Sequence, residues 1–113
     1  LLIKDELKDN LENIRNWMIK SLLNVLKDYK IPAIFKIPND IYVNDHKICG
    51  ILIETKLKDD ICEYIVIGIG LNINQTSFEN LKATSFKKEL GKTTHIKTVF
   101  KKIIESMAKH HDH

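Results

Sequence analysis

Apolar residues recur at three- and four-residue steps over residues 4–29, with lysine, aspartate and asparagine between them. These apolar positions are Leu7, Leu11, Ile14, Met18, Leu22, Val25 and Tyr29. The spacing predicts an amphipathic helix with one buried stripe. Pro32 stops this helix, because proline lacks a backbone N–H and disfavours helical geometry in the residue before it.

The middle of the sequence has the short apolar runs and turn residues that are typical of an antiparallel sheet. Residues 33–37 predict a first strand, which the following proline closes. Residues 41–43 and 47–54 predict the two strands of a hairpin. Asn44 and Asp45 join them, since both residue types tolerate the positive φ angles of a tight turn.

The remainder predicts one more strand and two helices. Residues 61–74, rich in isoleucine and valine, predict a buried strand. Residues 77–90 carry a weaker helical pattern, and Gly91 is the expected stop. Thr94 is expected to cap a last helix. The apolar positions of that helix are Ile96, Val99, Phe100, Ile103, Ile104 and Met107.

Length and composition fit one small domain. The chain has 113 residues, of which 43% are hydrophobic and 29% charged, and this is enough for a single core. The order of helix, hairpin-linked strands and helices predicts an α+β fold with a mixed or antiparallel sheet. We therefore expect residues 1–113 to form a single domain.

Charge and cysteine content narrow the class of protein. The net charge is only +3, and the cations are interleaved with acids, so nucleic-acid binding gets no support. The longest apolar run, residues 64–73, is too short to span a bilayer. Cys49 and Cys62 in an otherwise cysteine-poor chain favour a reducing, cytoplasmic location. Arg15 is the only arginine, so any site that needs a guanidinium must find it elsewhere.

Three local features combine polar chemistry with strand geometry. Residues 35–40 place a cation, an amide and a carboxylate at the kinked end of a strand. Lys47 opens an otherwise apolar strand. Gly68 and Gly70 stand at strand spacing and leave one face bare, so that a flat ligand can lie against the backbone. By simple alternation, Lys47 points to the same side as Cys49 and Ile51, and Ile48, Gly50 and Leu52 share the other side.

Each feature also has a purely structural interpretation. The polar residues after the first strand fit a turn, because asparagine and aspartate stabilise turns through side-chain hydrogen bonds. Lys47 fits an ordinary charge at a strand end. The two glycines fit a β-bulge or a close helix crossing, since a lone G-x-G is no dinucleotide fingerprint.

Together, however, the features resemble one family. The sequences KIPNDIYVNDHKICGILIE at residues 36–54, VIGIGLNIN at residues 66–74 and Ala83-Thr84-Ser85 closely resemble the catalytic domain of biotin protein ligases, also called biotin-[acetyl-CoA-carboxylase] ligases. The resemblance implies a class II synthetase-like fold with helices packed on one face of the sheet. It also implies a fragment from the centre of that domain, without the family's Gly/Arg-rich adenylate loop and its C-terminal domain.

The resemblance implies a two-step reaction. Biotin and ATP, with Mg²⁺, give biotinyl-5′-adenylate, which then reacts with a lysine of a biotin carboxyl carrier domain. Lys47 is implied as the catalytic residue, because an ammonium stabilises the negative charge that develops during attack on a phosphate. The implied biotin-binding residues are Lys47, Gly50, Ile51, Gly68 and Gly70. The implied ATP- or adenylate-binding residues are Lys36, Asn39, Asp40 and Asn72, with Asp40 also a ligand of Mg²⁺.

One departure and several alternatives stay open. The family usually has tryptophan after the first lysine, where this chain has Ile37. A lipoate or octanoyl ligase or transferase also places a lysine in a K-x-x-G strand. A third possibility is a binding module that holds biotin or its adenylate without turnover. Pairing of two copies through sheet edges is compatible with the family, whereas no membrane partner is expected.

Overall fold

A computed structural model describes residues 4–59, 61–78 and 82–110 of the chain. The elements, in order, are α1 (Lys4–Asp28), β1 (Ile34–Lys36), β2 (Asp40–Val43), β3 (His46–Lys58), β4 (Ile61–Leu71), α2 (Phe86–Leu90) and α3 (Ile96–His110). The strands form one antiparallel sheet in the order β1-β2-β3-β4. The predicted α+β class is therefore confirmed, whereas the single domain over residues 1–113 stays a prediction.

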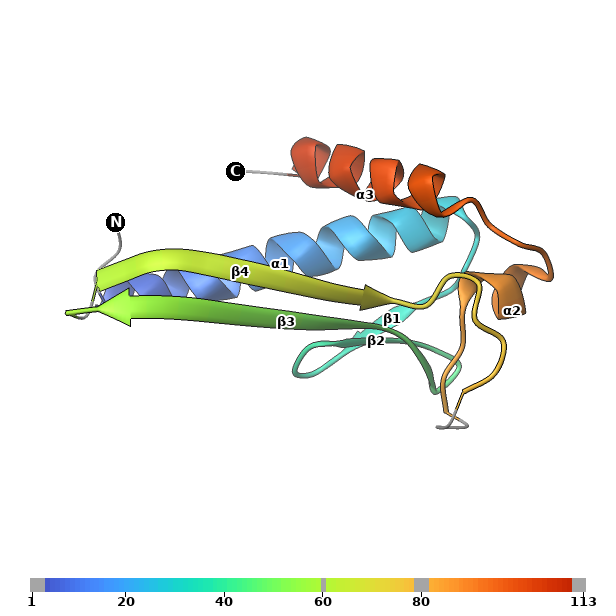
Figure 1. The fold of residues 1–113 in the computed structure, drawn as a ribbon, viewed down its shortest axis with the longest axis horizontal. Helices are drawn as coiled ribbons and strands as arrows, with labels where there is room; N and C mark the ends of the chain where they lie inside the picture. Colours follow the sequence, from blue (N-terminus) through green and yellow to red (C-terminus); the bar gives the residue numbers. More distant parts are fainter. Residues whose placement is uncertain (1–3, 60, 79–81, 111–113) are drawn as a thin grey trace.

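The helices lie on one side of the sheet, with α1 next to the strands and α3 packed along α1 (Figure 1). The core between them is formed by the apolar stripe of α1, the inward-facing residues of β2 and β3, the first residue of α2 and two residues of α3. Its members include Met18, Leu22, Val25, Leu26, Ile41, Val43, Ile48, Ile51, Phe86, Val99 and Ile103. Each such side chain contributes about 1.5–3 kcal/mol through burial. The expected helical cover on one face is confirmed.

The periodicity of α1 gave the buried face correctly. Met18 and Leu22 are 0% and 1% exposed, respectively. The side chain of Leu7, which belongs to the same sequence pattern, lies outside the described residues. A hydrogen bond also joins the two long helices, because the Trp17 indole N–H donates to the Met107 carbonyl at 2.8 Å. Although α1 has 25 residues, no helix in the described ranges is long and apolar enough to cross a membrane.

The β3–β4 hairpin is longer than the sequence pattern indicates, and its outer end extends away from the body (Figure 1). β3 continues to Lys58 through the polar stretch, whereas β4 ends at Leu71, three residues earlier than expected. Polar residues are tolerated here because residues 54–59 are exposed to solvent. The short β2–β3 turn is as predicted, with φ of 47° at Asn44 and 65° at Asp45.

Two predictions about the C-terminal helices are wrong. Residues 79–81 of the helix expected over residues 77–90 lie outside the described residues. In the described part of that range the only helix is the five-residue α2, because Ala83 forms a β-bridge with Lys47. Ser85 caps α2 by accepting a hydrogen bond from the Lys88 N–H at 3.1 Å. Gly91, with φ of 76°, ends it as expected.

Thr94 does not cap α3. Its buried hydroxyl has no hydrogen-bond partner. Asn74 instead holds the Thr94 backbone: its carboxamide donates to the Thr94 carbonyl at 3.0 Å and accepts from the Thr94 N–H at 2.9 Å. A distant side chain therefore fixes the entry to α3, and local spacing alone does not reveal it.

Candidate functional site

A β-bulge decides where the Lys47 side chain points. Ile41 pairs with Cys49 and Tyr42 pairs with Lys47, so Ile48 has no partner of its own on β2. Ile48 and Cys49 are consecutive and are 0% and 1% exposed. An extra residue shifts the alternation of the strand at that point. The prediction that Lys47 shares a side with Cys49 and Ile51 is therefore wrong.

Lys47 lies instead on the side of Gly50. A Cβ built on Gly50 would meet the Lys47 Nζ and Cε at 3.2 Å. The Lys47 Nζ forms an ion pair with the Asp40 Oδ1 at 3.1 Å, with the two side chains 43% and 30% exposed. Asp40 stands directly opposite Gly50 in the β2–β3 ladder. The bulge thus brings an ammonium, a carboxylate and bare backbone together.

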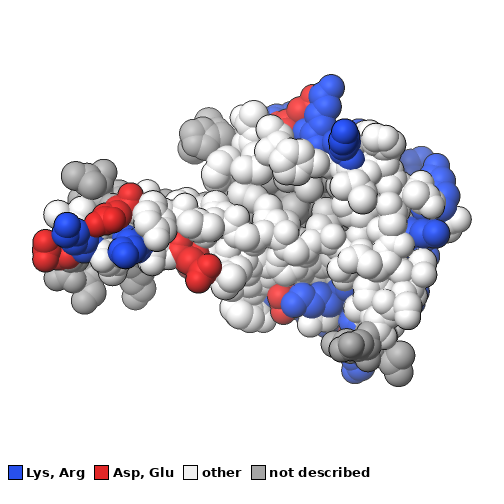
Figure 2. Space-filling view, in the orientation of Figure 1, with Lys and Arg blue, Asp and Glu red and all other residues white. Residues whose placement is uncertain are grey.

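These groups border an open groove of about 470 Å³ on the sheet. Its lining residues are Asp40, Lys47, Gly50, Ile51, Leu52, Gly68, Ile69 and Gly70. Gly50 pairs with Gly70, and Leu52 pairs with Gly68. Because glycines have no side chains, two adjacent strands expose backbone here that a flat ligand can approach. Figure 2 shows that charged side chains also gather away from this groove, at the outer end of the hairpin.

Ile51 does not present its side chain to the groove. That side chain is 4% exposed and belongs to the core. Its N–H donates to the Asn39 carbonyl at 2.8 Å, which ties β3 to the β1–β2 turn. Leu52, 58% exposed, is the aliphatic side chain available beside the glycines. Sequence reasoning missed Leu52 as a site residue, although alternation had placed it on the side of Gly50.

The residues expected on the nucleotide side are more dispersed. Of the four, only Asp40 lines the groove. The Lys36 Nζ forms an ion pair with the Asp45 Oδ1 at 3.0 Å, and it lies 4.6 Å from the centre of the Tyr42 ring. The hydrogen bond and positive charge of Lys36 lower the pKa of Asp45.

Asn39 and Asn72 do not line the groove, although Asn39 directly precedes Asp40, which does. The Asn39 side chain accepts a hydrogen bond from the Arg15 Nε at 3.0 Å. Arg15 had no assigned role, because nothing in the sequence indicates that α1 reaches this turn. The Asn72 N–H donates to the carbonyl of the bulged Ile48 at 3.0 Å.

The acidic residues allow only a limited role for a metal ion. Within the described residues, no group of three or more histidine, cysteine, aspartate or glutamate side chains is placed to hold one. Asp40 is the acidic residue of the groove. Mg²⁺ is often held by one or two carboxylates together with substrate phosphates and water. Asp40 fits that mode as a single carboxylate ligand.

Cys49 is next to the site but has no nucleophilic character. It is a free, buried cysteine. Burial raises the pKa of its thiol to about 12, and the nearby positive charge of Lys47 offsets only part of this increase. Since the thiolate is the reactive form of cysteine, Cys49 remains an inert core residue at neutral pH.

The third sequence motif also lies at the site. The Lys47 N–H donates to the Lys82 carbonyl at 2.8 Å, and the Thr84 N–H donates to the Lys47 carbonyl at 2.9 Å. Ala83, which lies between Lys82 and Thr84 in the sequence, therefore forms a parallel β-bridge with Lys47. Two motifs 36 residues apart in the sequence share one set of backbone hydrogen bonds.

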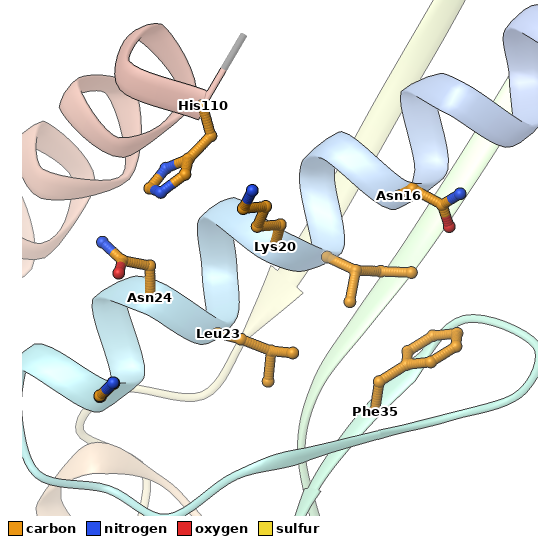
Figure 3. A pocket seen from close by; sticks show the side chains of 8 residues that line it. Asn16, Lys20, Leu23, Asn24, Phe35 and His110 are labelled. Atoms are coloured by element: carbon orange, nitrogen blue, oxygen red, sulfur yellow. The ribbon is translucent and has the colours of Figure 1, made fainter. Parts of the chain in front are cut away.

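A second hollow, of about 390 Å³, lies on the helical side of the molecule. Figure 3 shows Asn16, Lys20, Leu23 and Asn24 of α1 around it, with Phe35 on the β1 side and His110 at the end of α3. None of the residues predicted for biotin or ATP lines this hollow. The glycine-lined groove, in contrast, is lined by Asp40, Lys47 and the three predicted glycines.

Comparison with known proteins points to the same chemistry. Residues 1–72 match the sequence model of the biotin/lipoate A/B protein ligase family. The bifunctional ligase/repressor BirA of Bacillus spizizenii is 48% identical over 42 residues, which are 37% of this chain and 13% of that protein. The corresponding protein of Bacillus subtilis is 48% identical over 40 residues, or 35% of this chain and 12% of that protein.

Solved structures extend the similarity over nearly the whole chain. The apo structure of biotin protein ligase from Aquifex aeolicus superposes with a TM-score of 0.77 at 27% identity, covering 97% of this chain and 50% of that one. The same enzyme in complex with biotin and ATP gives a TM-score of 0.65 at 29% identity, covering 83% and 41%. The chain thus spans about half the length of these solved relatives and a smaller share of the curated ones.

Proposed function

This chain belongs to the biotin/lipoate A/B protein ligase family, and we propose that it contributes the catalytic lysine of an enzyme that attaches biotin to a carrier protein. In the first step, a biotin carboxylate oxygen attacks the α-phosphorus of ATP and pyrophosphate leaves. In the second, the amine of a carrier lysine attacks the acyl carbon, AMP leaves, and the nitrogen releases a proton. The proposed carrier is the biotin carboxyl carrier domain of a carboxylase.

The position of Lys47 over the glycine-lined groove carries this proposal. The first step brings a carboxylate towards a phosphate, so both reactants are negatively charged. An ammonium that is already in place stabilises this charge without further reorganisation. The Lys47 Nζ is held 3.1 Å from the Asp40 Oδ1, at the edge of the exposed backbone of Gly50.

We assign the remaining residues by their place around Lys47. The proposed biotin surface is the backbone of Gly50, Gly68 and Gly70, with Ile51 contributing backbone at its border and Leu52 an apolar side chain. The proposed nucleotide side is the region of Lys36, Asn39, Asp40 and Asn72. Asp40 would offer one carboxylate to Mg²⁺ that arrives with ATP.

A biotin-dependent exchange of radioactive pyrophosphate into ATP tests the first step. Lys47→Ala should lower the exchange rate about 100-fold or more, because a buried or positioned charge-stabilising donor typically has an effect of that size. Lys56→Ala is the matched control, since Lys56 lies on the same strand, exposed and outside the groove. We expect the control to retain the exchange rate of the unmodified protein.

Three other results would point elsewhere. Exchange that survives Lys47→Ala would contradict the assignment of the lysine. Transfer of a lipoyl or octanoyl group to the carrier, seen by mass spectrometry, would favour the lipoate branch of the family. Calorimetric binding of biotinyl-5′-adenylate without any exchange would indicate a binding module. A homodimer formed through sheet edges and a cytoplasmic location stay predictions of the same proposal.

A further inference from the structure

The backbone of Lys47 bonds to a segment that lies along the edge of β3 beyond the end of β4. β4 pairs with β3 up to the Cys49–Leu71 pair. Beyond it, the chain leaves the sheet, and residues 82–84 return to lie beside Lys47. Both backbone groups of Lys47 bond to this segment, with distances of 2.8 Å and 2.9 Å. We call residues 82–84 the clamp segment.

The clamp segment is itself anchored on its far side. Thr84 is 2% exposed, and its hydroxyl donates to the Glu89 Oε2 at 2.5 Å. Ser85 and Phe86, which follow, are both 0% exposed. The Phe86 ring packs edge-on against Tyr29, which directly follows α1, with a centroid distance of 5.1 Å. The clamp segment thus connects Lys47 to α2 and, through α2, to the helical layer.

A bulged strand needs such an anchor, because it has a competing register. Without the bulge, regular alternation would turn Lys47 to the side of Cys49 and Ile51, away from the groove. The β2–β3 turn sets the Tyr42–Lys47 pair, and the bulge lies beyond that pair, before Ile41 meets Cys49. Bonds to the Lys47 N–H and carbonyl from the opposite edge distinguish the bulged register from the regular one.

We propose that Thr84 and Glu89 are positioning residues. Their hydrogen bond holds the clamp segment against the backbone of Lys47 and thereby keeps the Lys47 ammonium on the groove side of β3. The catalytic consequence rests on the function proposed above. The structural consequence, the held backbone of Lys47, does not depend on that function. Different experiments can therefore refute the catalytic consequence and the structural consequence.

Amide hydrogen exchange of the full chain, followed by NMR, tests the structural part. Thr84→Val removes the hydroxyl at nearly constant volume. We expect exchange of the Lys47 and Thr84 amides to rise at least tenfold relative to the Ile51 amide, which bonds to Asn39 instead. Thr84→Ser keeps a hydroxyl and should restore both rates to within threefold of the unmodified chain.

Two further variants complete the test. Glu89→Gln keeps an acceptor oxygen but loses the charge, so we expect an intermediate rise of about threefold. If Thr84→Val does not fold, the amide exchange rates of Glu89→Gln test the proposal in its place. Thr98→Val is the matched control, because Thr98 is an exposed residue of α3 whose hydroxyl contacts His95 rather than the clamp segment. Unchanged Lys47 exchange in both Thr84→Val and Glu89→Gln would overturn the proposal.

Kinetics test the catalytic part. In pyrophosphate exchange, Thr84→Val should lower kcat about tenfold, while Thr84→Ser and Thr98→Val stay within twofold. A loss of kcat that serine does not rescue would overturn the positioning role, since it would indicate a general loss of folding. If the full-length protein shows no exchange at all, the proposed function fails, and the amide rates alone then decide on the clamp segment.

Discussion

The two ends of the β3–β4 hairpin have the same strand pairing but very different surroundings. At the inner end, Cys49 and Ile51 are 1% and 4% exposed and lie against β2 and the helical layer. At the outer end, Leu57 and Tyr64 are 42% and 53% exposed. Cross-strand bonds continue along both. Regular pairing therefore does not by itself create a site.

The difference lies in what surrounds the strands. The inner end contacts β2, α1 and the clamp segment, and there the ladder departs from regularity at the Lys47 bulge. Many contacts allow a strand to hold an irregular register and to keep a charged side chain in one place. The described residues of β3 at the outer end, 54–58, are exposed to solvent, which accommodates polar side chains. We therefore expect variants at the two ends to differ sharply.

The largest expected difference concerns the thiol at the inner end. With its pKa raised to about 12, Cys49 has about a thousandfold less thiolate at pH 8 than a cysteine with the ordinary pKa of 9.0. In a Cys62→Ser variant, labelling of Cys49 by iodoacetamide should therefore be slower by about that factor in the folded chain than in urea. Mass spectrometry of the labelled chain measures both rates.

The sign of the pH dependence follows from the same shift. A thiol whose pKa is raised on folding stays neutral in the folded chain while it ionises in the unfolded one. Stability from this group is thus complete below the unfolded pKa and is lost as the pH rises from that value towards about 12. Rapid labelling at pH 8 without urea would contradict the closed inner end.

The next largest difference concerns stability along β3. Ile51→Ala removes a core side chain and should lower the free energy of unfolding by about 2–4 kcal/mol. Leu57→Ala, on the same strand but 42% exposed, should lower it by about 0.5 kcal/mol. Urea unfolding followed by circular dichroism compares them. Equal losses would show that the outer end is as well packed as the inner one.

The same contrast explains what the sequence could reveal. The periodicity of α1 and the Asn44-Asp45 turn depend on neighbours in the sequence, and both predictions are confirmed. The glycine face also follows from alternation, and the structure brings Gly50, Gly68 and Gly70 into one groove. Local rules are sufficient for the helix, the turn and the shared face of Gly68 and Gly70, because each depends on residues a few positions apart. The pairing of β3 with β4 then adds Gly50.

The bulge and the clamp segment depend instead on distant partners. Whether Ile48 is an extra residue depends on how β2 pairs, and the side of Lys47 follows from that. The bridge to Ala83 ends the helix that spacing predicts upstream of Phe86. Likewise, Arg15 reaches Asn39 across 24 positions. The family resemblance therefore pointed to several residues that line the groove, but not to the geometry that orients the lysine.

The smallest expected effect distinguishes the glycines of the groove from one another. A methyl group on Gly50 would meet the Lys47 Nζ and Cε at 3.2 Å, so the flexible lysine must move. A methyl on Gly70 would have the Gly50 carbonyl at 4.0 Å as its neighbour and displace nothing. Gly50→Ala should therefore weaken biotin binding about tenfold, which corresponds to about 1.4 kcal/mol. Gly70→Ala should weaken biotin binding only about threefold, because its methyl group contacts the ligand without moving Lys47.

Calorimetric titration with biotin measures both glycine variants, and a Lys47→Met background isolates the cause. If Gly50→Ala acts by displacing the ammonium, its excess over Gly70→Ala should disappear once the ammonium is gone. An excess that persists in the Lys47→Met background would mean that Gly50 acts only as a ligand-contacting surface. The inner end would then bind biotin only through the shape of its exposed backbone, and the β-bulge would not contribute to binding.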